Sequence, residues 1–167
     1  MALNQPSSRR TVEQKRAAEA WDAILEVERE SEQARLAKVR NPKLRGEFHG
    51  EYGSLSRGLP AMIQVNGLAM TMAFLYSKIG TGDKIKKEYQ YLYNHISKRI
   101  KNYLLTTDEL MEFIRTASTD QYRRATTEAI AYAIWLKRYA EGKNWKSKDG
   151  GSNQEEEGMQ TDEQPAE

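Results

Sequence analysis

Residues 58–78 read GLPAMIQVNGLAMTMAFLYSK, an apolar stretch that is interrupted at its centre by Asn66 and Gly67. A membrane span needs about 20 consecutive, predominantly apolar residues. This stretch also contains Gln64 and ends in Lys78. We therefore do not expect it to lie in lipid, and we expect no membrane partner.

The spacing in this stretch predicts a helix that is surrounded by protein on most sides. Pro60 suits the first turn of such a helix. The polar residues align in one narrow strip, and large apolar residues occupy the remaining circumference. Asn66 falls on the apolar side, where a buried amide without partners costs about 1–3 kcal/mol. We therefore expect the Asn66 side chain to be buried and hydrogen-bonded in the central helix of the core.

Helical spacing dominates the rest of the chain, and strand alternation is nearly absent. A chain of 167 residues favours one domain with a single core. We predict an all-α fold, a compact single-domain bundle of about five to six helices within residues 9–142. Besides the central helix, helices are expected near residues 11–35, 83–104, 107–116 and 119–141.

The first helix is predicted to begin at Thr11, which has Gln14 three residues later, as in a capping box. Its buried stripe is expected to contain Ala17, Trp21 and either Ile24 or Leu25. The following residues 28–35, ERESEQAR, contain no large apolar side chain. We expect them to project beyond the core or to fray.

Glycines interrupt the segment before the central helix, at Gly46, Gly50, Gly53 and Gly58. Each glycine costs about 0.5–1 kcal/mol in a helix interior relative to alanine. Two interpretations stay open. The segment is either a distorted short helix or loop, or it has a glycine face that allows close backbone approach to a partner chain or a phosphate.

Charge is distributed unevenly along the chain. Residues 149–167 contain seven acidic residues and no basic one, so the net charge of +2 for the whole chain leaves +9 on residues 1–148. We expect disorder in residues 1–8 and in an acidic tail at 143–167, because neither has the apolar content to offset its ordering entropy. The tail either screens the basic body or only increases solubility.

The helix expected at residues 83–104 has a basic face. Lysines with interleaved tyrosines suit phosphate contact and base stacking, although a solvated lysine face explains the pattern equally well. Its outward residues are Lys84, Lys87, Tyr91, His95, Lys98 and Lys101.

Catalysis finds little support in the sequence. The chain has no cysteine, and neither of its two histidines lies in a metal-binding or nucleophile motif. Glu47 and Glu51 flank His49 but form no complete ligand set. We therefore expect a binding protein without catalytic residues, cofactor or metal. The chain also begins without the apolar segment of a secretory signal, which together with the missing cysteines favours a cytoplasmic location.

Three blocks carry a family resemblance. They read RRTVEQKRAAEAW at 9–21, LPAMIQVNGLAMTMAFLYSK at 59–78 and ATTEAIAYAIWLKRYAEG at 125–142. Together they resemble the small subunit of type III-B CRISPR effector complexes, the Cmr small-subunit family. The resemblance implies a noncatalytic helical bundle that stacks with copies of itself, beside the backbone ribonuclease subunit and the large subunit. It also implies that the bundle supports the duplex of CRISPR RNA and target RNA in antiviral defence.

The resemblance also implies site residues. Asn66 and Gly67 match structural positions rather than contacts. The basic residues of the blocks, expected on the RNA side, are Arg10, Lys15, Arg16, Lys78, Lys137 and Arg138. The second candidates for RNA contact are Lys84, Lys87, Lys98 and Lys101. Two alternatives stay open: a stand-alone helical RNA-binding protein, and a metal enzyme that uses Glu47, His49 and Glu51.

Overall fold

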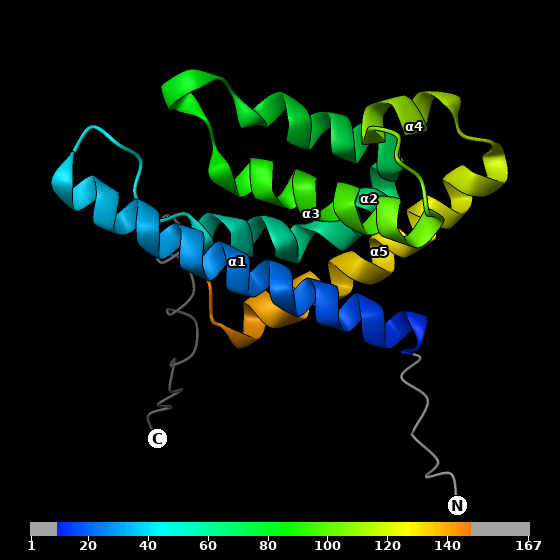
Figure 1. Cartoon of the computed structure of the whole chain (residues 1–167), viewed down its shortest axis with the longest axis horizontal. Helices are drawn as coiled ribbons and strands as arrows, with labels where there is room; N and C mark the ends of the chain where they lie inside the picture. The colour runs from blue at the N-terminus through cyan, green and yellow to red at the C-terminus, as the bar shows by residue number, and fades with distance from the viewer. Residues whose placement is uncertain (1–9, 148–167) are drawn as a thin grey trace, which may run out of the picture.

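The computed structural model describes residues 10–147, and these residues form a helical bundle without strands (Figure 1). The all-α prediction is confirmed. The predictions for residues 1–8 and 148–167 lie outside the described part. The elements in chain order are α1 (Val12–Arg40), α2 (His49–Ile79), the 3-10 helix η1 (Gly82–Lys84), α3 (Lys87–Leu104), α4 (Leu110–Thr116) and α5 (Thr119–Gly142).

Helix α1 begins with the predicted capping box. The Gln14 amide donates to Thr11 Oγ1 at 3.1 Å, and the Thr11 amide donates to Gln14 Oε1 at 2.9 Å. The predicted buried stripe is wrong in part, because Trp21 and Leu25 are each 40% exposed. Small residues face the core instead, so α1 can lie close to the alanine-rich face of α5. The buried residues of α1 are Ala20, Ala23, Ile24, Val27, Ser31 and Ala34.

The second half of α1 neither projects nor frays. Helix α1 continues to Arg40, and Ser31 is fully buried. Ser31 Oγ accepts hydrogen bonds from the backbone amides of Phe48 at 2.8 Å and His49 at 3.1 Å. A side chain of α1 therefore satisfies the first amides of α2, which has no capping side chain of its own.

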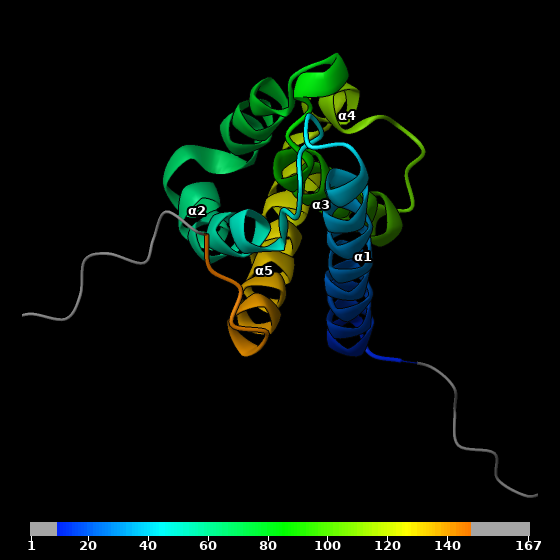
Figure 2. The same ribbon diagram turned by 90° about the vertical axis from the view of Figure 1, so that its left-hand side faces the viewer.

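Helix α2 does not begin at Pro60, as the sequence predicted, but at His49, and it changes direction at Gly67. Gly67 has φ 81° and ψ 164°, a backbone conformation essentially restricted to glycine. The break is held by hydrogen bonds. Thr71 Oγ1 donates to the Gly67 carbonyl at 2.8 Å, and the Ala69 amide donates to the Tyr122 hydroxyl at 3.0 Å. The first half of α2 lies along α5, and the second half folds back over α3 (Figures 1 and 2).

The prediction that protein surrounds α2 on most sides is wrong. Helix α2 is long and apolar enough, by length and composition, to cross a membrane, yet only 33% of its most apolar 18 residues are buried. The bend at Gly67 divides it into two shorter helices, and both halves contribute to the core of the bundle. Since a span requires about 20 residues of continuous helix, this geometry suits a protein-facing surface rather than a membrane.

The chain continues to pack beyond Gly142, the expected end of the domain. Residues 143–147, here called the C-terminal strap, cross the first turns of α2. Trp145 is buried, with its ring centroid 5.5 Å from that of His49 and 6.2 Å from that of Tyr52. The Ser147 amide donates to Ser54 Oγ at 3.1 Å.

The strap explains two of the glycines. A Cβ atom at Gly53 would lie 2.6 Å from Trp145 Cβ, and one at Gly50 would lie 2.3 Å from the Lys146 carbonyl oxygen. A glycine face for close backbone approach is therefore present, but it receives the chain's own strap rather than a partner chain or a phosphate.

Candidate nucleic-acid interface

Arg16 belongs to a buried ion network that joins three helices. Its Nε and Nη2 atoms donate to the two carboxylate oxygens of Glu128 at 2.8 and 2.7 Å. Arg99 donates to Glu128 at 2.7 Å and to Glu19 at 2.9 Å. Burial opposes the ionisation of Glu128, but the hydrogen bonds from Arg16 and Arg99 outweigh it and hold the pKa of this carboxyl below its ordinary value. The Nε and Nη2 atoms of Arg16 are therefore engaged within the bundle, while its contact with RNA stays a prediction.

The other basic residues of the three blocks lie on separate parts of the surface. Arg10 and Lys15 are exposed at the start of α1. Lys78 is exposed at the end of α2, with its Nζ 5.6 Å from the Phe74 ring centroid. Lys137 and Arg138 lie on the last turns of α5, and Arg138 donates to Glu141 at 3.2 Å. The end of α2 and the end of α5 are at opposite edges of the bundle (Figures 1 and 2).

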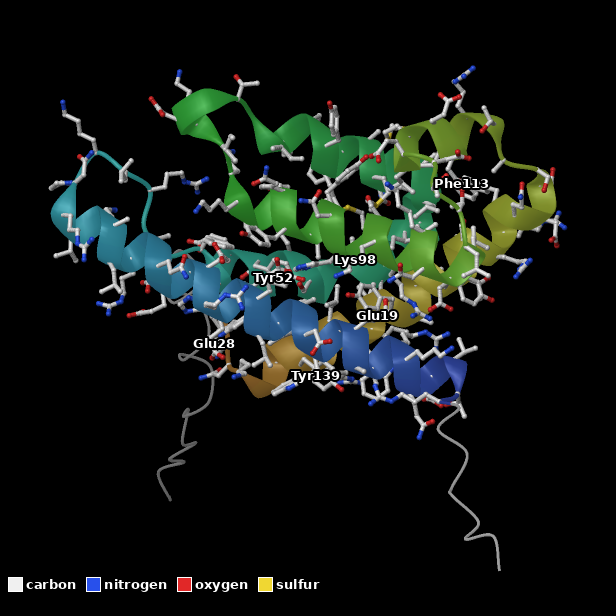
Figure 3. All side chains as sticks on the ribbon, in the orientation of Figure 1. Glu19, Glu28, Tyr52, Lys98, Phe113 and Tyr139 are labelled. Carbon is white, nitrogen blue, oxygen red and sulfur yellow. The ribbon has the colours of Figure 1, made fainter. Side chains whose placement is uncertain are left out.

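The lysines expected on one face of α3 are divided between two environments. Lys101 pairs with Glu109 at 2.6 Å. Lys98 lines a small acidic cavity with Glu19, Asp22 and Glu26, and Figure 3 places it above Glu19 between α3 and α1. Lys87 lies at the other end of α3, and Lys84 lies before it in η1. The predicted uniform lysine face is therefore partly neutralised by carboxylates of α1 and of the α3–α4 connection.

His95 was expected to face outward, but it is buried. Tyr52 Oη lies 2.9 Å from His95 Nδ1, and Glu26 Oε2 lies 3.0 Å from His95 Nε2. Burial lowers the pKa of His95, although the hydrogen bond to Glu26 opposes this effect. A neutral imidazole that accepts from Tyr52 and donates to Glu26 satisfies all three groups. His95 thus connects α1, α2 and α3.

The other histidine takes part in the contact between α1 and α2. His49 Nδ1 lies 2.9 Å from Ser31 Oγ. Between residues 10 and 147, no three or more histidine and carboxylate side chains are grouped so that they could hold a metal ion. Glu47, His49 and Glu51 therefore form no such group.

A pocket of about 270 Å³ opens between the end of α1, the 41–48 connection and the turn before α3. Its floor is largely apolar. The lining residues are Ala34, Ala37, Leu44, Arg45, Gly46, Phe48, Gly82, Asp83, Ile85, Lys87 and Gln90.

Basic residues line this pocket or adjoin its lining residues, and we call it the basic-rimmed pocket. Arg45 is held in place by the Ile85 carbonyl and the Glu88 carboxylate, each at 3.3 Å. The Lys38 side chain lies against Gly46, and the remaining rim residues adjoin lining residues in sequence. Apart from Arg45, none of the rim residues pairs with a carboxylate of the described chain. The basic rim consists of Lys38, Lys43, Arg45, Lys84, Lys86 and Lys87.

Sequence reasoning selected Lys84 and Lys87 of this rim and missed the other four. A signal was present, because residues 38–45, KVRNPKLR, are densely basic. These residues lie next to the turn before α3 only because the chain, after α2, folds back beside the end of α1. Patterns within a short stretch of sequence do not reveal this contact.

The part of α2 on both sides of the Gly67 bend, residues 62–76, exposes large apolar side chains, here called the distal α2 surface. Val65, Met70, Phe74 and Tyr76 are 82, 67, 38 and 60% exposed. Met62, Asn66, Met70, Thr71 and Phe74 line a shallow hollow of about 350 Å³ on this surface. Asn66 is exposed, so the predicted buried amide is wrong. The reason is the bend at Gly67, which turns this side of the helix toward solvent.

Comparison with known proteins assigns the chain to a family. The sequence model of CRISPR-associated protein (Cas_Cmr5) matches residues 12–143, which include every helix from α1 to α5 and the first residue of the strap. The chain belongs to the Cmr5 family. The predicted resemblance to the Cmr small-subunit family is confirmed.

Relatives of this Cmr5-family chain agree in sequence and in fold. The CRISPR system Cmr subunit Cmr5 of Thermus thermophilus is 34% identical over 104 residues, which are 62% of this chain and 83% of the relative. The X-ray structure of a Cmr5 family protein from the same organism has a TM-score of 0.57 and 28% identity. It covers 80% of this chain and 97% of the solved one.

The Cmr5 match places the interface candidates relative to the family domain. The basic-rimmed pocket, the distal α2 surface and the ion network of Arg16 all lie within the matched residues. Residues 144–167 follow the match, so Trp145 of the strap and the acidic segment lie beyond it.

Proposed function

We propose that this Cmr5-family chain is a noncatalytic small subunit of a type III-B CRISPR ribonucleoprotein that acts in antiviral defence in the cytoplasm. It stacks with copies of itself and with the backbone ribonuclease subunit and the large subunit. In this position it supports the duplex of CRISPR RNA and target RNA. Family membership supports the subunit role, and the distal α2 surface is the observation that carries the assembly role.

The distal α2 surface supports assembly because exposed apolar side chains gain free energy when a partner covers them. Burial of apolar area contributes about 25 cal/mol per Å². Contiguous exposed apolar surface on a soluble protein commonly marks a protein contact. Unpaired cations elsewhere on the molecule supply a separate surface for phosphate. Apolar contacts for subunits and cations for RNA can thus act at the same time.

Reconstitution of the complex tests the assembly role. Met70→Glu and Tyr76→Glu together should reduce incorporation of this subunit, because the partner would have to bury two charges. Leu105→Glu is the matched control, since Leu105 is 90% exposed on the α3–α4 connection and outside the distal α2 surface. Equal incorporation of both variants would contradict the proposed contact. Failure of the Met70→Glu and Tyr76→Glu variant to incorporate, with an unchanged melting temperature, would support the contact.

Charge reversal tests the RNA role. We expect reversal of a phosphate-contacting cation to lower target-RNA retention and to reduce the salt slope by about 1 per contact. Lys78→Glu, the pair Lys137→Glu and Arg138→Glu, and the pair Lys84→Glu and Lys87→Glu should be measured separately. Lys137 and Arg138 lie near the end of α5, whereas Lys78 lies in the last turn of α2 and Lys84 and Lys87 follow it at the turn into α3. Unchanged retention and slope in all three variants would contradict the proposed support of the duplex.

The same measurements distinguish the alternative of a stand-alone RNA-binding protein. A subunit should bind RNA weakly alone and strongly only in the complex. Tight, salt-dependent binding by the isolated chain would favour the alternative, which the unpaired cations of the basic rim also suit.

A further inference from the structure

We propose that the basic-rimmed pocket is the docking site of the chain's own acidic segment, residues 155–163, EEEGMQTDE. Met159 occupies the apolar cavity, and the flanking carboxylates lie against the basic rim. This proposal concerns a contact of the chain with itself and does not rest on the proposed function. Its consequence is that the segment competes with any other polyanion for the rim.

The lining of the pocket selects the kind of occupant. Apolar atoms of Ala37, Leu44, Phe48 and Ile85 face the cavity, and they gain stability only from an apolar group. Met159 is the one large apolar residue in 149–167. A methionine side chain is unbranched and flexible, so it can fill an irregular cavity.

The rim selects the charge of the occupant. Arg45 and Lys87 line the cavity, and the Lys38 side chain lies against the lining residue Gly46. Lys43, Lys84 and Lys86 adjoin lining residues in sequence. Within residues 10–147, Arg45 forms an ion pair with Glu88. Asp83 is the acidic residue in the lining. Residues 155–163 offer five carboxylates around Met159. Individual exposed ion pairs are weak, about 0.2–1 kcal/mol, so several are needed and the docking should weaken as salt increases.

The position of Ser147, from which the chain leads to the acidic segment, makes the contact reachable. The strap crosses α2 beside Gly50 and Ser54, and Phe48, two residues before Gly50, lines the pocket. Residues 148–159 can extend by about 40 Å at 3.3–3.6 Å per residue. The entropy of closing a loop of this length grows only slowly with its size. The docked segment therefore needs no rearrangement of the bundle.

RNA phosphate is the competing occupant. Phosphates would bind the rim cations, but they would leave the apolar cavity empty. The combination of an apolar floor with a cationic rim favours an acidic peptide that carries one apolar side chain, and residues 155–163 have this composition.

A paramagnetic label on the full chain tests the proposal. The chain has no cysteine, so Thr161→Cys gives a single site for a nitroxide. We expect the label to broaden the amide signals of Gly46, Phe48, Gly82 and Lys87 at low salt, with recovery at high salt. Met159→Ser should lower the ratio of docked to free segment by roughly tenfold, the effect of losing one buried methionine side chain. Gln160→Ser is the matched control and should leave the broadening unchanged.

Changes in the pocket provide a second measurement. Ala37→Trp fills the cavity and should abolish the broadening. If that variant fails to fold, the pair Lys84→Glu and Lys87→Glu, which are surface changes, should abolish it as well. Uniform or absent broadening in the labelled chain that carries only Thr161→Cys would overturn the proposal. Equal broadening after Met159→Ser and after Gln160→Ser would overturn it as well.

Two further outcomes would assign the pocket to another occupant. ¹⁵N protein without the nitroxide, mixed with nitroxide-labelled ¹⁴N protein, reports contacts between copies. Broadening in that mixture as strong as within one chain would overturn the proposal in favour of a second copy's segment. An oligouridylate that shifts the pocket signals with equal affinity in the unmodified chain and in Met159→Ser would overturn it in favour of RNA. Tighter oligouridylate binding by Met159→Ser would support the proposed competition.

Discussion

Gly67 sets the course of α2 at the scale of a single residue. Its positive φ permits the bend, where Thr71 donates to the Gly67 carbonyl and Tyr122 accepts from the Ala69 amide. The bend also explains why Asn66 and its neighbours face solvent. One backbone conformation thus creates both the folded-back second half of α2 and the exposed distal α2 surface.

We predict that Gly67→Ala lowers the free energy of unfolding by about 1–3 kcal/mol, because a side chain strains a backbone conformation that only glycine adopts readily. Gly58→Ala is the matched control in the same helix. Gly58 has helical geometry and open space where a Cβ atom would be added. This control should therefore gain about 0.5–1 kcal/mol. Urea unfolding of both variants measures the difference. Equal stability of the two variants would show that a side chain at position 67 causes no backbone strain.

At the scale of elements, the position of the C-terminal strap depends on its packing against helix α2. Gly50 and Gly53 bring the α2 backbone close to the strap, and the Trp145 ring then packs against Tyr52 and His49. The strap also places Ser147 beside Ser54 in the first turns of α2. Contacts between these two elements therefore stabilise the fold and keep residues 155–163 within reach of the basic-rimmed pocket.

We predict that Gly53→Ala detaches the strap while leaving the helices formed. The added Cβ would lie 2.6 Å from Trp145 Cβ and 2.8 Å from the Trp145 carbonyl oxygen, so the strap must move. Hydrogen exchange at the Ser147 amide, which donates to Ser54, should become faster. The amides of α5 should keep their protection. Unchanged exchange at Ser147 would mean that the strap accommodates the extra methyl group in place.

The ion network of Arg16, Arg99 and Glu128 connects helices across the whole molecule. Arg16 comes from α1, Arg99 from α3 and Glu128 from α5. The side chains of Arg99 and Glu128 are each 3% exposed, whereas Arg16 is 17% exposed. Removing one partner of a buried ion pair leaves an uncompensated charge inside the protein.

We predict that Glu128→Gln lowers the free energy of unfolding by about 3–5 kcal/mol, because Arg99 would keep its buried charge with only the partly exposed Glu19 left as a partner, and Arg16 would lose its carboxylate. Arg16→Gln should cost less, since Arg99 still neutralises Glu128. Thermal and urea unfolding of the two variants test this order. A larger loss in Arg16→Gln would show that the pair of Arg16 and Glu128, rather than Arg99, dominates the network.

The sequence by itself determined the features that depend on near neighbours along the chain. The capping box of Thr11 and Gln14, the all-α class and the positions of most helices follow from contacts three or four residues apart. The three motif blocks led to the family for a similar reason, because they are continuous stretches. The excess of positive charge on residues 1–148 is a property of composition and needs no structure.

Only the tertiary structure decided which faces of these helices are buried and what their polar groups contact. Trp21 is 40% exposed and packs edge-on against Tyr139 of α5, with the ring centroids 5.1 Å apart, and no pattern within α1 contains that information. Ser31 meets the start of α2, Arg16 meets Glu128, and Arg45 meets the Ile85 carbonyl only after the chain has folded back on itself. Such contacts join residues from different elements, so their energies depend on the packing of the bundle rather than on local spacing.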